Sequence, residues 1–168
     1  MARTGSIVRE GVIVGLIGYA TVAVFYTVFD VLAARGAGFT LELMGKVVFR
    51  GARDPAILQL PPTPDPGAMV GYNLLHLVVS LAVGLFVAGL ISRVEERPTL
   101  AVPVVLTLVA GYLITILGIG RLVQDLTPLV PWWTIVIVNT LAAVAGALYL
   151  SRVHPDLIGR VRGTSAVA

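Results

Sequence analysis

The sequence predicts an all-α membrane protein, a four-transmembrane-helix bundle, and three observations carry that prediction. Of its 168 residues 57% are hydrophobic and only 12% are charged, whereas about a quarter of a soluble domain is charged. Apolar stretches fill most of the chain at residues 11–34, 68–91, 100–119 and 131–150. Each stretch has about 20 residues or more, which at about 1.5 Å per residue nearly matches the hydrocarbon thickness of a bilayer.

The first stretch, residues 11–34, follows Arg3 and Arg9. Its apolar run is longer than the roughly 7–15 residues of a secretory signal, so we expect it to be retained as the first span. Because only short tails and loops flank the apolar stretches, we interpret residues 1–168 as a single membrane domain.

The connection between the first two spans is the longest one and has two parts. Residues 39–50 place apolar side chains at helical spacing on one face and Lys46 and Arg50 on the other, with Thr40 as the expected N-cap. The apolar positions are Leu43, Met44, Val47 and Val48. This pattern predicts an interfacial amphipathic helix. Residues 51–67 are proline-rich and predict an extended surface segment, suited to lie along a neighbouring subunit.

The second half of the chain shows a weak sequence repeat of the first. Gly18-Tyr19 in the first span matches Gly111-Tyr112 in the third, and the second and fourth spans both end in Ser-Arg-Val. Two tandem helical hairpins would produce this order, although matches of two or three residues also arise by chance.

Charge distribution sets the expected orientation. Four spans return the chain to its starting side, and seven basic residues fall on the side of the termini against five on the other side. Arginine outnumbers lysine. Alanine, glycine and valine are abundant, and this composition is typical of a bacterial gene of high GC content. We therefore expect a multi-pass protein of the bacterial cytoplasmic (inner) membrane with both termini in the cytoplasm.

Several function classes are disfavoured by the sequence. The chain has no cysteine, which excludes disulfides, cysteine-held iron–sulfur clusters and thiolate zinc sites. No span carries a metal-ligand pair at helical spacing, and no catalytic or phosphate-binding motif occurs. No basic patch with interleaved aromatics suggests nucleic acid. We expect a protein that is not an enzyme and has no metal, no cofactor and no nucleic-acid partner.

Polar residues in the spans gather in the half of the membrane that we expect to be the outer one. We predict a ligand-binding pocket there, formed by Asp30, Asn73, His76, Arg121, Asp125 and Asn139. From the span ends, His76 lies about 9 Å deep and Asn139 about 12 Å deep. Asp30 and His76 would bind a proton, a cation or a polar headgroup, with Arg121 as the counter-charge.

A structural role is the competing interpretation. In that case Asp30 pairs with Arg121 or faces Arg35, and His76 ties helices together through a carbonyl or Asn139. A haem on His76 would need a partner chain or a single axial ligand, because His154 lies beyond the opposite membrane face. The small residues Gly11 and Gly15, and those in 142–147, predict close packing of the first span on the fourth, or a contact with another subunit.

Three functions follow, in decreasing order of support. The first is a non-catalytic subunit of a larger bacterial membrane complex, for example one of electron transport, with other membrane protein subunits and lipids as partners. The second is a small transporter or an ion-, lipid- or quinone-binding membrane protein that uses the outer pocket. The third is a membrane enzyme that uses Asp30 and His76 as an acid/base pair.

Overall fold

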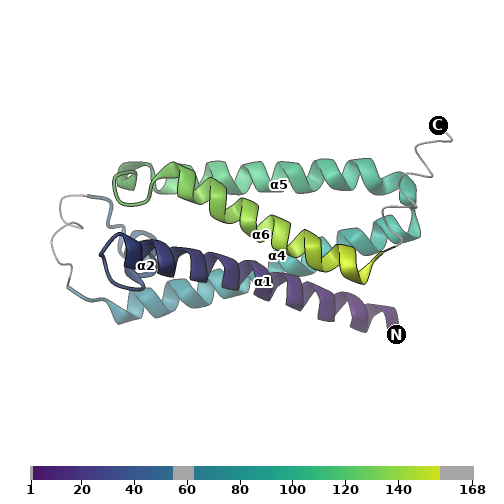
Figure 1. The fold of residues 1–168 in the computed structure, drawn as a ribbon, viewed down its shortest axis with the longest axis horizontal. Coiled ribbons are helices and arrows are strands. Elements are labelled where there is room, and N and C mark those ends of the chain that lie inside the picture. The colour runs from purple at the N-terminus through teal and green to yellow at the C-terminus, as the bar shows by residue number, and fades with distance from the viewer. Residues whose placement is uncertain (1, 55–62, 156–168) are drawn as a thin grey trace.

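The computed structural model describes residues 2–54 and 63–155, and this part of the chain is helical without strands (Figure 1). The α-helices are α1 (Ala2–Leu32), α2 (Phe39–Arg50), α4 (Pro66–Glu96), α5 (Ala101–Leu122) and α6 (Trp132–Val153). Two short 3-10 helices, η1 (Pro98–Leu100) and η2 (Gln124–Leu126), lie in the turns before and after α5.

Within the described residues, four helical segments are long and apolar enough to cross a membrane: Gly5–Leu32, Pro66–Glu96, Pro98–Leu122 and Trp132–Val153. The all-helical class and the four candidate spans are therefore confirmed. The helices continue past the apolar stretches, as α4 does to Glu96, because backbone hydrogen bonding does not stop where polar side chains begin.

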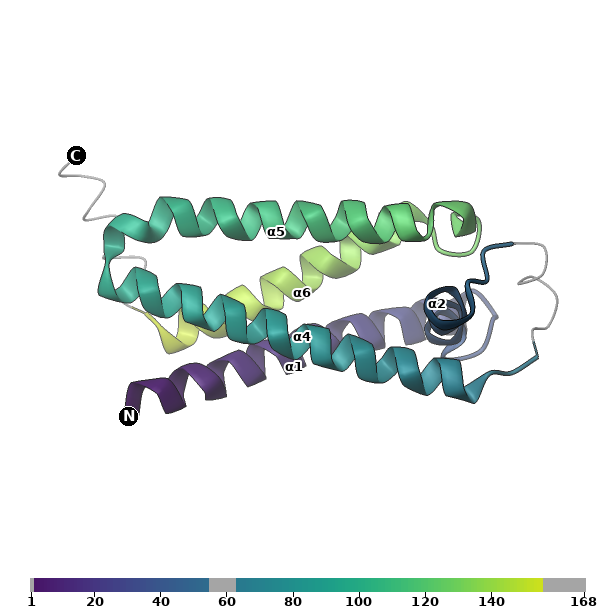
Figure 2. The same ribbon diagram turned by 180° about the vertical axis from the view of Figure 1, so that it is seen from behind.

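The bundle has two distinct ends. The start of α1, the turn between α4 and α5, and the end of α6 lie together at one end, which we call the terminal end (Figure 1). The opposite end, called the loop end, carries α2 and the connection from α5 to α6 (Figure 2). The described helices thus begin and finish at the same end, as four antiparallel crossings require.

Helices α1 and α4 cross in direct backbone contact. A Cβ atom on Gly84 would lie 2.2 Å from the carbonyl oxygen of Gly11 and 2.4 Å from the nitrogen of Gly15. Small residues permit this approach, which maximises dispersion contacts between apolar helices. The sequence placed Gly11 and Gly15 against the fourth span or another subunit. Within the described residues these two glycines contact α4, whereas the small-residue face of α6 meets α1 at Gly146, whose Cβ position lies 3.6 Å from Val14.

Helix α2 lies across the loop end of the bundle. Its apolar side chains Leu43, Met44 and Val47 are buried in a cluster with Val123, Leu126 and Ile135. Gly45 allows close contact with α4, since a Cβ there would lie 2.2 Å from the Ala68 carbonyl oxygen. The helix is amphipathic as predicted, and Leu43, Met44 and Val47 of its apolar face pack on the other helices, whereas Val48 is exposed.

The segment before α4 fastens α2 by its polar side. Asp65 caps α4 by accepting from the Ala68 nitrogen at 2.9 Å, and it also pairs with Arg50 of α2. These hydrogen bonds lower the pKa of the Asp65 carboxyl, with the Ala68 nitrogen as the larger cause. Of the predicted proline-rich segment 51–67, residues 55–62 lie outside the described residues.

Helix α5 packs through a stripe that is one residue wide. Val104, Leu108, Tyr112 and Ile116, at every fourth position, face the bundle, and the other residues between 104 and 116 are exposed. Its neighbours α4 and α6 approach it at opposite ends and diverge from it elsewhere (Figure 2). The two hairpins therefore differ in packing, α1–α4 being close along the crossing and α5–α6 open.

The helix crossing makes a direct prediction. Gly84→Ala should destabilise the fold by about 1–3 kcal/mol, because the added methyl meets backbone that cannot yield. Gly89→Ala on the same helix is the control, since nothing lies within 4 Å of its Cβ position. Unfolding in mixed detergent micelles, followed by circular dichroism, measures both. Equal stability of the two variants would contradict the crossing.

Candidate functional site

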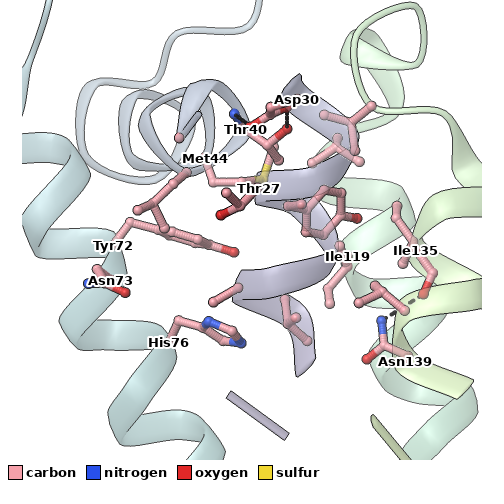
Figure 3. A pocket seen from close by; sticks show the side chains of 18 residues that line it. Thr27, Asp30, Thr40, Met44, Tyr72, Asn73, His76, Ile119, Ile135 and Asn139 are labelled. Atoms are coloured by element: carbon pink, nitrogen blue, oxygen red, sulfur yellow. Dashed lines mark hydrogen bonds between the residues drawn. The ribbon is translucent and has the colours of Figure 1, made fainter. Parts of the chain in front are cut away.

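A cavity of about 140 Å³ lies near the loop end, bounded by α1, α2, α4, α6 and the end of α5 (Figure 3). Its walls are mainly aliphatic, with residues such as Val22, Met44, Ile119 and Val138. Helix α2 forms one wall through Gly38, Thr40, Leu41 and Met44. The helix that the sequence assigned to the interface thus helps to enclose the candidate site.

Four of the six predicted site residues line this cavity: Asp30, Asn73, His76 and Asn139. The other two, Arg121 and Asp125, are exposed and do not line it. Arg121 donates to the Gln124 side chain at 2.9 Å, which anchors it to its own turn. Within the described residues, the expected counter-charge for Asp30 is therefore absent from the cavity.

Asp30 caps the amino end of α2. Its side chain is fully buried, and its two carboxylate oxygens accept from the Thr40 nitrogen at 2.7 Å and the Thr40 hydroxyl at 2.6 Å. The N-cap of α2 is Gly38, at φ 91°, which has no side chain to offer. A carboxylate suits this position because the first N–H groups of a helix lack partners and carry partial positive charge. Thr40 is a donor here and not the N-cap that the sequence predicted.

Arg35 reinforces the same corner of the molecule: its backbone nitrogen donates to the Asp30 carbonyl oxygen at 2.9 Å, but its guanidinium does not bond to the Asp30 carboxylate. Its guanidinium donates to the Leu129 carbonyl and lies over the Phe29 and Phe39 rings, 5.7 and 5.4 Å from their centroids. Arg35 therefore links the α1–α2 turn to the α5–α6 connection. Neither ion pair considered for Asp30 in the structural interpretation is formed.

His76 points into the cavity from α4 (Figure 3). Its ring contacts those of Tyr19 and Tyr72, with centroids 5.3 and 6.2 Å away, and lies within 16° of parallel to Tyr72. Within the described part of the chain, neither the imidazole nor the Tyr72 hydroxyl makes a hydrogen bond. Both groups therefore retain hydrogen-bonding capacity beside an apolar space.

The two asparagines are partly satisfied. The Asn73 side-chain oxygen accepts from the Tyr19 hydroxyl at 2.6 Å, which ties α4 to α1. Asn139 donates to the Ile135 carbonyl at 2.8 Å in its own helix, which leaves its side-chain oxygen available. The expected link between His76 and Asn139 is not formed.

The site predicted from the sequence left out four polar residues of the cavity wall: Tyr26, Thr27, Thr40 and Tyr72. Tyr72 lies one helical turn before His76, and this spacing was the signal available for it. Tyr26 faces the cavity from α1, and its hydroxyl lies 3.4 Å from that of Thr134 on α6. Tyrosine combines an apolar ring with a polar tip, so it is well suited to the wall of a mixed site.

A second polar cluster at the terminal end was also missed. His154, directly after α6, contacts Glu95 through Nδ1 at 2.7 Å and Glu10 through Nε2 at 2.9 Å. Burial lowers the pKa of His154, but the hydrogen bonds from Glu95 and Glu10 outweigh it and the net pKa is raised. The signal was topological, because these residues lie at the same-side ends of three spans.

Comparison of the chain with protein-family models, curated proteins and solved structures gives no match.

The role of Asp30 is testable. Asp30→Asn should loosen α2, because its amide group presents a donor where Thr40 also donates, and a lost cap costs about 1–2 kcal/mol. Amide hydrogen exchange in residues 39–50, read by mass spectrometry, should accelerate about tenfold. Asp125→Asn, the same change at an exposed site, is the control. Unchanged exchange in Asp30→Asn would contradict the capping role.

Proposed function

We propose that this chain is a membrane-embedded binding protein whose cavity takes one small, uncharged ring with polar substituents, as in a quinone or a phenol. The observation that carries the proposal is the imidazole of His76, which lies in an apolar cavity beside the Tyr72 hydroxyl without a hydrogen bond from the described residues. Polar groups in such surroundings are normally satisfied, so a ligand that satisfies them gains affinity.

The expected ligand is uncharged because the cavity offers no free charge. Asp30 is its one carboxylate among the described residues, and both of its oxygens accept from Thr40. Arg121 lies outside the cavity. An anion would lose hydration there without gaining a counter-charge, which is strongly unfavourable. A cation would meet only a carboxylate whose two oxygens already accept from Thr40. The cavity therefore suits an uncharged ligand better than the ions and charged headgroups considered from the sequence.

The size of the cavity favours a single ring. A volume of about 140 Å³ is close to the roughly 150 Å³ of an apolar cavity that admits benzene. It is too small for a porphyrin, so a haem on His76 is disfavoured. Donors on α4, from His76 and Tyr72, suit the carbonyl oxygen of a quinone, and the free oxygen of Asn139 on α6 would accept from a ring hydroxyl, as in a phenol or a reduced quinone.

The proposal places the helices across a bacterial cytoplasmic (inner) membrane with both termini in the cytoplasm. The excess of basic residues on the terminal side supports this orientation. The cavity then lies in the outer half of the bilayer, where an apolar tail on the ring would extend into lipid. We propose binding without catalysis, since none of the described hydroxyl groups makes the hydrogen bond to the His76 imidazole that would activate it as a nucleophile.

Filling the cavity tests the proposal. Ala23→Leu adds three carbon atoms to the cavity wall, so the affinity for a benzoquinone with a decyl tail should fall at least about tenfold. Ala20→Leu, the same change at an exposed position of α1, should bind as the unaltered protein does. Quenching of tryptophan fluorescence in detergent gives the dissociation constants. Equal affinity of both variants would overturn the cavity as the binding site.

The hydrogen-bonding part of the proposal has its own control. Tyr72→Phe should weaken binding of the same quinone by about 2- to 10-fold, the worth of one neutral hydrogen bond. Tyr112→Phe also removes one hydroxyl, which contacts Thr140 at 2.6 Å away from the cavity, and should have no effect. The same loss in both variants would indicate a general effect on the fold.

A second candidate function is the non-catalytic subunit of a larger membrane complex. The packing of α5 favours it, because most exposed residues outside its narrow stripe are apolar, including Val105, Val109 and Leu113. Lipid contacts do not by themselves drive helices together, whereas a shape-matched helix of another subunit would add dispersion contacts along this face. The partners would be other membrane protein subunits, with lipids around the remaining surface.

Bulky substitutions test this second candidate. Val109→Trp on α5 should reduce recovery of co-purifying membrane subunits at least about tenfold, since a clash in a packed interface costs about 1–3 kcal/mol. Val78→Trp places the same bulk on the exposed face of α4 and is the control. Native mass spectrometry after extraction in mild detergent counts the bound subunits. Recovery of the chain alone, before any substitution, would refute the candidate.

A further inference from the structure

We propose that Glu10, Glu95 and His154 form a proton-binding site at the terminal end of the bundle, and that the bound proton fastens the end of α6 to α1 and α4. The site is separate from the cavity, and its ligand is the hydrogen ion. It uses residues that the proposed binding function leaves without a role.

The geometry fits a proton on each ring nitrogen. Nδ1 faces an oxygen of Glu95 at 2.7 Å, and Nε2 faces an oxygen of Glu10 at 2.9 Å. An ionised carboxylate only accepts hydrogen bonds, so each nitrogen must donate. Neutral imidazole has one N–H and the imidazolium has two. The arrangement therefore matches one cation between two anions.

The surroundings keep this cation in place. The side chains of His154 and Glu10 are only 12% and 11% exposed, and that of Glu95 is 28% exposed. The Ser6 hydroxyl donates to the second oxygen of Glu10, which orients that carboxylate. Among the described residues, the titratable groups that face His154 are Glu10 from α1 and Glu95 from α4. Charge-assisted hydrogen bonds are stronger between such buried groups than between groups in water.

Loss of the proton to solvent turns the attraction within the site into repulsion. One ring nitrogen then presents a lone pair to a carboxylate, and two anions remain with no cation between them. The raised pKa of His154 sets the direction with pH. Because the folded pKa lies above the ordinary value of 6.5, the stabilisation is complete below that value. It is lost as the pH rises through the folded pKa.

The element that responds is the end of α6. Helices α1 and α4 are held together by the backbone contact of Gly11 and Gly15 with Gly84, which carries no titratable group. On the terminal side, the hydrogen bonds of His154 join the end of α6 to α1 and α4. Deprotonation should therefore release α6 and leave the α1–α4 pair unchanged.

Titration of the histidines is the first test. The sequence has only His76 and His154, so the two imidazole signals of the isotope-labelled protein are assigned by His76→Gln. The His154 pKa should lie above 6.5 and should fall toward it in Glu10→Gln and in Glu95→Gln. An unshifted pKa in the unaltered protein, or one that neither variant lowers, would overturn the site.

A distance measurement tests the movement. The chain has no cysteine, so spin labels at Val8→Cys and Val153→Cys, both at exposed positions, report the spacing of α1 and α6 without background. Between about pH 6 and about pH 9 the distances should lengthen reversibly. With His154→Gln added they should not change with pH. Equal distances at both pH values in the labelled parent, or the same lengthening with His154→Gln, would overturn the proposal.

A substitution that unfolds the protein would leave the distance test without its control. Glu95→Gln is therefore measured in the same labelled background, since it is the most exposed member and its loss should be tolerated best. It should shift the transition to lower pH. A transition at an unchanged pH would count against His154 as the group that binds the proton.

Discussion

The backbone contact between α1 and α4 is the constraint on which the other features depend. Gly11 and Gly15 on one helix and Gly84 on the other bring the two axes closer than any side chain would allow. A close crossing between straight helices makes them diverge on either side. The space toward the loop end becomes the cavity below α2, and the space toward the terminal end receives His154 between Glu10 and Glu95. The α1–α4 contact thus positions both polar regions.

The chain accommodates buried carboxylates in two different ways. Asp30 has no paired cation and is satisfied by the amino end of a helix, where partial positive charge and N–H donors coincide. Glu10 and Glu95 share a single ring that becomes cationic only when protonated. The first arrangement is independent of His chemistry and serves the fold. The second depends on pH near neutrality and is suited to respond to it.

The four candidate spans and four of the six predicted site residues could be derived from the sequence for a clear physical reason. Hydrophobic length and helical phase are local properties, so the four spans and the shared face of Asn73 and His76 could be derived from composition and spacing. The partner of a polar side chain is a property of the tertiary fold. For Asp30 the sequence suggested Arg121 or Arg35, and only the fold of the α1–α2 turn shows that its carboxylate accepts from Thr40. Likewise, nothing local shows that Glu95, in the last turn of α4, contacts His154.

The cap and the apolar cluster of α2 have a consequence for the order in which the protein is made. Asp30, which completes the amino end of α2, is synthesised before that helix, but its apolar partners Val123, Leu126 and Ile135 come long after it. A nascent chain with only its first span inserted therefore carries an α2 whose apolar face has no protein to cover it. The bilayer surface is the natural place for such a helix to wait. The amphipathic pattern of α2 then suits an early stage of biogenesis, and the cavity is completed when α5 and α6 pack against α2.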